Sequence, residues 1–138
     1  MVREIIKDES ILTKKSEKFI IGQDDSIITD MIDTANAHKE NCVGLAAVQI
    51  GVHKRVILVW HNGKFLPFIN PVIVQKSKET YTTKESCLSL DGAREVKRHK
   101  GIKVIYQTRN GKSMCMAFSG FTAEIIQHEI DHLNGILI

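Results

Sequence analysis

The sequence lacks any hydrophobic run as long as a membrane span and has only three cysteines. None of its apolar stretches approaches the roughly 20 residues that a helix needs to cross a bilayer. The N-terminal segment MVREIIKDES mixes acidic and basic residues and has no apolar region typical of a secretory signal. An odd number of cysteines without such a signal argues against a disulfide framework and for a reducing compartment. We therefore expect a cytoplasmic protein without a membrane partner.

A strong excess of charge of either sign is also missing. The chain has 19 Lys and Arg against 16 Asp and Glu, a formal charge of +3, which is too small to predict direct nucleic-acid readout. The only locally basic run is REVKRHK (94–100), which we interpret as a solvated strand edge or loop. The alternative is a patch that meets an anionic group or a nucleic-acid-rich partner. With no repeat or linker, the 138 residues are expected to form a single catalytic domain over 1–138.

Hydrophobic periodicity predicts two helices and several strands. Apolar residues recur at helical spacing in 24–41 and in 119–135. Strands are predicted at 55–60, 65–70, 70–75, 79–83, 102–108 and 113–119. The Asn-Gly pairs in HNGK and RNGK predict hairpin turns. The expected fold is α+β, with antiparallel sheets of hairpins packed around a C-terminal metal-binding helix and a second helix in the N-terminal third.

The segment HEIDH (128–132) carries the clearest chemical pattern. Residues four apart lie on one helical face, so the imidazoles of His128 and His132 can meet one cation. The side chain of Glu129 projects from the helix in a different direction from His128. It can therefore lie beside the water molecule on the metal without binding the metal itself, as in the zinc-peptidase H-E-x-x-H pattern. A catalytic site usually has three protein ligands and one open position. The few residues after His132 offer no good ligand, so the third must come from upstream.

The three cysteines and the other histidines are the candidates for the third ligand. Cys115 lies in an apolar strand, where a cysteine is most often a small buried hydrophobe. Cys42 precedes a run of small residues, and Cys87 lies in KESCLSL, where a strand could deliver a thiolate. The residue chemistry favours Cys87 over Cys42 without deciding between them.

Three motifs, in this order, resemble those of the peptide deformylase family. VGLAAVQIG (43–51) is similar to its first motif, ESCLS (85–89) to its second and HEIDH to its third. The spacing of the motifs, the position of Arg94 after ESCLS, and the segments ILTKKSEKF and FINPVIV also resemble this family. The resemblance therefore covers nearly the whole chain.

The resemblance implies a metal-dependent hydrolase that removes the formyl group from the initiator methionine of new polypeptides and releases formate. It implies that Cys87, His128 and His132 bind one divalent metal, most often Fe(II), with Zn, Ni or Co as alternatives. Glu129 would be the general base and then the general acid, while the Gln49 amide and the Leu88 N–H would stabilise the oxyanion.

Substrate contacts follow from the same resemblance. Gly44 would line the extended substrate, which is a nascent peptide that starts with formyl-Met. Val43, Phe121 and Ile125 are candidates for the methionine pocket, although each is equally compatible with plain core. Arg94 is expected to orient the first motif or Glu85.

Four departures from the family pattern bear on this interpretation. Ser86 and Cys42 stand where the family usually has glycine, and a serine there could strain the cysteine-bearing strand. The proline that commonly follows the second motif is replaced by LDGA. The family often contacts the ribosome through a C-terminal helix, and this sequence stops at Ile138. The ribosome is thus only a weakly supported partner.

Two other functions fit parts of the sequence. A metallopeptidase of the HExxH type would use the same helix and metal. A degenerate deformylase-like protein would bind peptide ends with little turnover. Ser86 and the LDGA segment after the second motif support this alternative hypothesis.

Overall fold

The computed structural model describes residues 1–138 and contains three α-helices and seven strands. The helices are α1 (Glu9–Leu12), α2 (Asp25–Ala37) and α3 (Gly120–Leu133). The strands are β1 (Gly44–Ala46), β2 (Val56–His61), β3 (Lys64–Lys76), β4 (Thr80–Cys87), β5 (Leu90–His99), β6 (Gly101–Gln107) and β7 (Ser113–Ser119), and a 3-10 helix (Ala47–Ile50) follows β1. The predicted α+β class, with hairpins around a C-terminal helix, is confirmed. No helix combines the length and the hydropathy that a membrane span requires.

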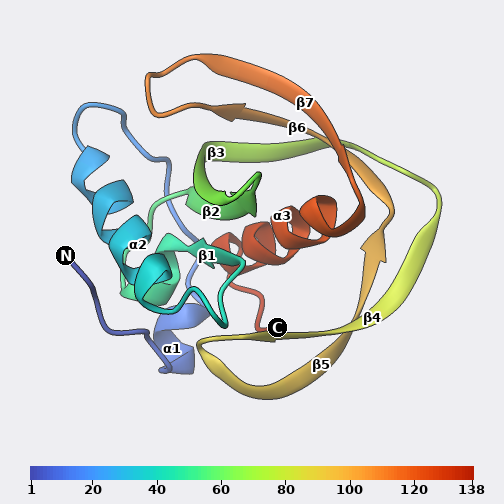
Figure 1. The fold of residues 1–138 in the computed structure, drawn as a ribbon, viewed down its shortest axis with the longest axis horizontal. Helices are drawn as coiled ribbons and strands as arrows, with labels where there is room; N and C mark the ends of the chain where they lie inside the picture. The colour runs from blue at the N-terminus through green and yellow to red at the C-terminus, as the bar shows by residue number, and fades with distance from the viewer.

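Five strands form an antiparallel sheet in the order β1-β2-β3-β6-β7 (Figure 1). The predicted Asn-Gly hairpins join β2 to β3 and β6 to β7. Strand β3 is long enough to pair with β2 through its first half and with β6 through its second. Irregular register between Ile69 and Val72 marks the change of partner, as bulges commonly do where a strand bends.

Strand β2 is buried on both faces, which explains its continuous run of apolar residues. Val56 and Leu58 belong to a core cluster with Met31 of α2, while Ile57 and Val59 belong to a second cluster with Ile126 of α3. Successive side chains of a strand point to opposite faces, so the sheet has one helix packed on each side. The core therefore fixes α3 against the sheet.

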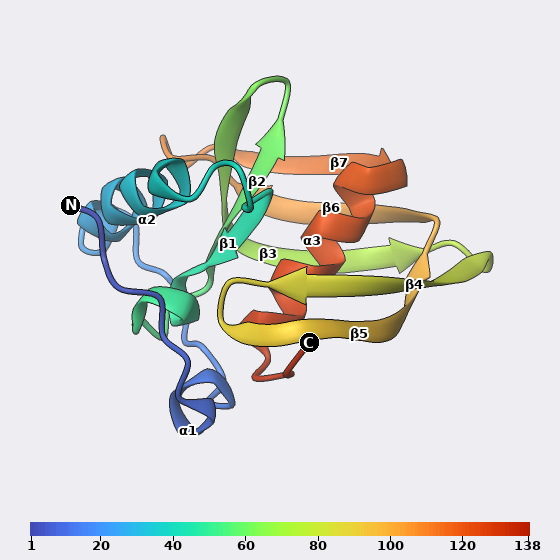
Figure 2. The same ribbon diagram turned by 60° about the horizontal axis from the view of Figure 1, so that its bottom comes forward.

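Strands β4 and β5 pair only with each other and lie on the other side of α3, so α3 runs between this hairpin and the large sheet (Figures 1 and 2). The interpretation of 94–100 as a solvated edge or loop was wrong for Arg98, which lies on β5 and is only 5% exposed. A two-stranded ribbon is marginally stable alone, so its contacts with α3 must hold it.

Candidate metal centre and active site

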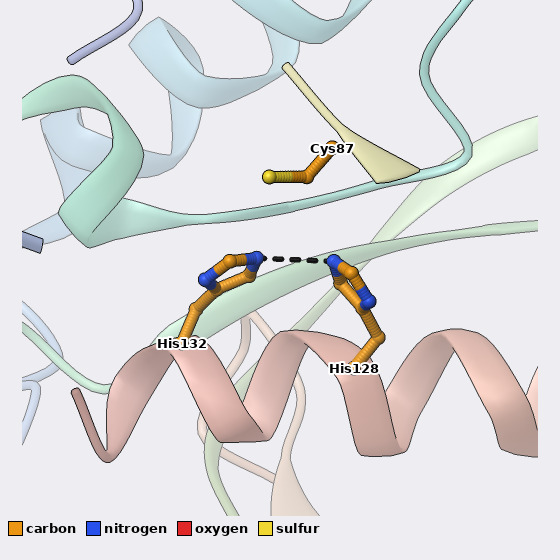
Figure 3. Close-up of side chains that lie close together, drawn as sticks. All are labelled: Cys87, His128 and His132. Carbon is orange, nitrogen blue, oxygen red and sulfur yellow. Dashed lines mark hydrogen bonds between the residues drawn. The ribbon is translucent and has the colours of Figure 1, made fainter. Parts of the chain in front are cut away.

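Two buried histidines of α3 face the tip of the β4–β5 hairpin. His128 and His132 lie one turn apart, and their Nε2 atoms are 3.0 Å from each other (Figure 3). Cys87 ends β4, directly before the turn formed by Leu88 and Ser89. One ligand atom from each of Cys87, His128 and His132 lies within 4.8 Å of the others. Of the thiols left open by the sequence, the fold brings this one to the histidines.

The other two cysteines lie elsewhere. Cys42 packs in the core cluster that contains α2, and its thiol donates a hydrogen bond to the Gly44 carbonyl at 3.2 Å. Burial raises the pKa of the Cys42 thiol to about 12, so the thiolate that a metal needs is disfavoured there. Cys115 is exposed on β7, so the sequence expectation of a small buried hydrophobe was wrong for it.

The donor set fits a first-row divalent metal. Two lone pairs only 3.0 Å apart repel, so His128 and His132 need a proton or a metal ion between their Nε2 atoms. Burial lowers the pKa of His128, but hydrogen bonds with Cys87 and Glu85 outweigh it and raise the pKa to about 10. Burial, together with the charge on His128, lowers the pKa of His132 to about 3. The two directions are those of a pair that shares one proton, a position that a metal ion can take, and two imidazoles with a thiolate form a three-ligand site of the catalytic kind.

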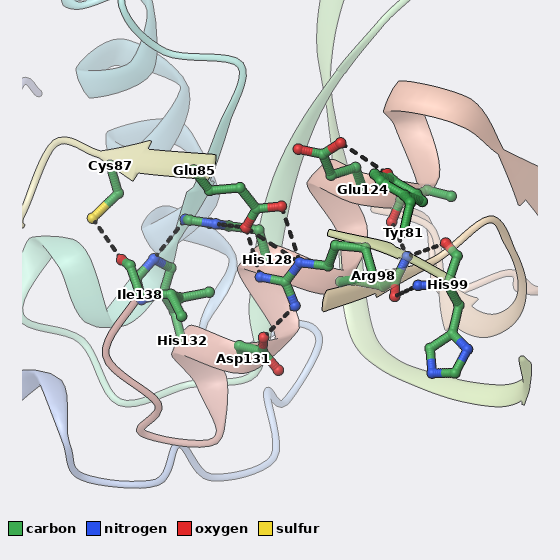
Figure 4. A network of polar contacts seen from close by, with 12 residues as sticks. Tyr81, Glu85, Cys87, Arg98, His99, Glu124, His128, Asp131, His132 and Ile138 are labelled. Carbon is green, nitrogen blue, oxygen red and sulfur yellow. Dashed lines mark hydrogen bonds and ion pairs between the residues drawn. The ribbon is translucent and has the colours of Figure 1, made fainter. Parts of the chain in front are cut away.

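A buried ion network orients His128 from behind (Figure 4). The Nδ1 of His128 lies 2.7 Å from Glu85 Oε1, and Arg98 donates to both oxygens of Glu85 at 2.6–3.2 Å. Arg98 also donates to Asp131 of α3 at 2.6 Å. Although burial raises the pKa of Glu85, the bonds from His128 and Arg98 lower it to about 2. The charged carboxylate therefore keeps Nδ1 protonated and turns Nε2 toward the cluster.

Glu129 lies beside the histidines with an unsatisfied oxygen. Its side chain is 5% exposed, and Oε1 has no hydrogen-bond partner within the chain. Burial raises the pKa of Glu129 to about 7, a value suited to accepting and returning a proton at neutral pH. Gly44 of β1 packs directly against this carboxylate, because a Cβ at Gly44 would lie 2.7 Å from Glu129 Oε2.

Gln49 and Leu88 supply hydrogen-bond donors near the cluster. Gln49 is 1% exposed; its Oε1 accepts from the Ala46 N–H at 3.0 Å and its Nε2 donates to Ser89 Oγ at 3.2 Å. Since an amide nitrogen carries two hydrogens, one remains for another acceptor. The backbone N–H of Leu88 donates no hydrogen bond within the chain. Two donors are therefore left for a ligand.

A cavity of about 230 Å³ lies beside α3, and its wall contains the functional candidates Cys87, His128, Glu129, Gln49 and Leu88. Its wall includes four of the predicted substrate residues, Val43, Gly44, Phe121 and Ile125. Arg94 is not part of this wall, and its side chain makes no hydrogen bond or ion pair within the chain; it lies on β5 opposite Glu85. The arginine that holds Glu85 is Arg98.

Several residues of the site were missed at the level of sequence. Arg98 was interpreted as part of a solvated basic run, whereas Asp131 and Ser89 appeared only as members of motifs. The register of β4 and β5 would have identified Arg98, because it places Arg98 opposite Tyr81, on the same face as Glu85 four residues later. Ser86 is exposed and does not have a positive φ, so the strain expected from its replacement of glycine is not found.

Comparisons with known proteins agree with this geometry. The family model described as polypeptide deformylase matches residues 2–138. The peptide deformylase of Clostridium beijerinckii is 49% identical over 138 residues and is covered completely, as is this chain. The crystal structure of an Acinetobacter baumannii peptide deformylase with Met-Ala-Ser bound has a TM-score of 0.89 at 32% identity, covering 99% of this chain and 97% of that one. The peptide deformylase of Ehrlichia chaffeensis has a TM-score of 0.90 at 34% identity, covering 99% and 86%.

Proposed function

The chain belongs to the peptide deformylase family, and we propose that Cys87, His128 and His132 hold the metal with which it removes the formyl group from nascent peptides. The observation that carries this assignment is the convergence of one thiol and two imidazoles within 4.8 Å, beside a buried carboxylate oxygen without a partner. Residues 1–138 would act as one catalytic domain, since the family match extends over residues 2–138.

The protein's own residues would divide the remaining chemistry among them. A bound divalent metal would lower the pKa of water and polarise the formyl oxygen. Glu129 would take a proton from the attacking water and return it to the leaving amine, a role worth roughly 10² to 10⁴ in rate. The free N–H of the Gln49 amide and the N–H of Leu88 would donate to the negative formyl oxygen. Losing one such donor typically costs about 10² to 10³ in rate.

The edge position of β1 supports an extended peptide as substrate. Strand β1 pairs only with β2, so its outer edge can accept another strand. Met-Ala-Ser is bound to the related Acinetobacter baumannii enzyme. A formyl-Met peptide lying along Gly44 would bring its formyl group to Glu129, because Gly44 and Glu129 are in contact. Val43, Phe121 and Ile125 would then line the side-chain pocket.

Three finer assignments belong to this proposal. The metal would be Fe(II), which the thiolate of Cys87 would leave sensitive to oxygen; Zn, Ni or Co would replace it in protein purified in air. The protein would act in the cytoplasm on chains leaving the ribosome, because formylated N-termini arise there. Arg94, on the same hairpin as Cys87, would contact the substrate or steady the first motif.

The decisive experiment is formate release from formyl-Met-Ala-Ser by anaerobic, Fe(II)-loaded protein, with the metal content measured in the same sample. Glu129→Gln should keep the metal and lose turnover by roughly 10² to 10⁴. An internal peptide with a blocked N-terminus should stay intact. Cleavage of that peptide would point to a metallopeptidase instead, and peptide binding without formate would point to a degenerate binding protein.

A further inference from the structure

The cavity contains a carboxylate that the proposed reaction does not use. Glu124 of α3 lies in the cavity wall, one turn before His128 and on the same helical face as Phe121. The rise of an α-helix places its Cα about 6 Å along the axis from that of His128. A substrate whose formyl group meets the metal centre would thus direct its first side chain toward Glu124. The sequence had predicted an apolar lining at this point.

Glu124 is held in place but not neutralised. Tyr81 Oη donates to Glu124 Oε1 at 2.8 Å, and no cation lies within ion-pair distance of either oxygen (Figure 4). Arg98, the nearest buried cation, is used by Glu85 and Asp131. Burial raises the pKa of Glu124 and the nearby Glu85 adds to this, while the bond from Tyr81 opposes it. The second oxygen of this partly buried carboxylate accepts no hydrogen bond from another residue of the chain.

Lys84 also borders the cavity but does not supply this donor. Lys84 is exposed and lies opposite Glu95 in the register of β4 and β5. Glu85, the next residue, points inward to Arg98. Side chains alternate along a strand, so Lys84 belongs to the outer face of β4. The cavity wall around Glu124 therefore has an excess of hydrogen-bond acceptors.

We propose that Glu124, held by Tyr81, is a specificity-determining residue that favours a hydrogen-bond donor or a positive charge in the first side chain of the formylated peptide. The inference rests on the proposed function and extends its substrate class beyond formyl-Met, to formylated peptides that begin with a cationic or amide side chain. A thioether offers no donor to a carboxylate, so methionine gains nothing from Glu124. Lysine or glutamine would complete its hydrogen bonding.

The test compares kcat/KM for formate release from formyl-Met-Ala-Ser, formyl-Lys-Ala-Ser and formyl-Met-Lys-Ser. Glu124→Leu should raise the preference for methionine over lysine at the first position by about tenfold, the scale of one hydrogen bond to a charged group. Glu124→Gln, which keeps the shape, should show a smaller rise. Glu95→Gln removes an exposed charge outside the cavity and should leave the preference unchanged.

Two results would overturn the proposal. One is a methionine-to-lysine preference that stays within about twofold in Glu124→Leu. The other is a change confined to formyl-Met-Lys-Ser, which would place Glu124 against the second side chain. Calorimetric binding of the product peptides Met-Ala-Ser and Lys-Ala-Ser gives the same comparison without turnover. Absence of formate from all three peptides with an unaltered binding preference for lysine would count against the proposed function alone.

Discussion

Replacing Gly44 by alanine should slow formate release by about a hundredfold while the metal stays bound. The new Cβ would lie 2.7 Å from Glu129 Oε2 and 2.7 Å from Ile125 Cγ2, whereas ordinary contact begins at 3.4 Å. Both neighbours are buried on α3, which packs against β1 and β2, so neither can move freely. The carboxylate must retreat by about 0.7 Å, and misplacements near 1 Å cost about 10²-fold in rate.

Stability should fall less than activity. Overpacking a core typically costs about 1–3 kcal/mol, which the domain can tolerate. The measurements are kcat/KM for formyl-Met-Ala-Ser, metal content and the urea midpoint of the same preparation. Gly101→Ala is the matched control, because its Cβ would meet nothing closer than Phe118 O at 3.7 Å. If Gly44→Ala kept more than about a third of the activity with full metal content, Glu129 would not be the proton carrier that we propose.

Three further outcomes follow from the site. Cys87→Ala should empty the metal centre and Cys42→Ala should not, as elemental analysis of the anaerobic proteins would reveal; the reverse pattern would exchange their roles. Arg98→Met removes the cation that Glu85 and Asp131 share and leaves the buried Glu85 with only His128, so it should cost about 3–5 kcal/mol in urea unfolding; a loss below 1 kcal/mol would contradict the network. Burial and then the bond to Glu124 raise the pKa of Tyr81 to about 12, so the folded state holds this proton more tightly than the unfolded one. The resulting stability is complete below pH 10 and lost between about 10 and 12, and an ultraviolet titration of Glu124→Leu should show Tyr81 ionising at lower pH.

The large sheet could be predicted from sequence because its signals are local. Asn-Gly turns fix the β2–β3 and β6–β7 hairpins, and the first four residues of β2, Val56–Val59, are apolar because helices cover both of its faces there. Strand β5 carries no such signal. Its inward residues include Arg98, and a charged residue can be assigned to the interior only when its partners are known.

The third metal ligand also could not be assigned from local sequence signals. Cys42 and Cys87 both stand in short segments near family-like motifs, so residue chemistry alone left them as alternatives. The fold separates them through distant contacts: Cys42 turns its thiol to the Gly44 carbonyl, and Cys87 reaches two histidines more than 40 residues away. Glu124 was missed for a related reason, because a glutamate on a helix is most often exposed to solvent and only the cavity reveals its position.

The network around Arg98 links the folding of the hairpin to the assembly of the metal centre. The β4–β5 ribbon could not hold Cys87 in place alone, since it pairs with no other strand. Arg98 joins Glu85 of β4 to Asp131 of α3, and Glu85 in turn orients His128. The same contacts therefore dock the ribbon on α3, set the direction of one imidazole and bring the thiol to it. A metal bound by Cys87 and the two histidines would cross-link the same two elements, so metal binding and docking of the hairpin should stabilise each other.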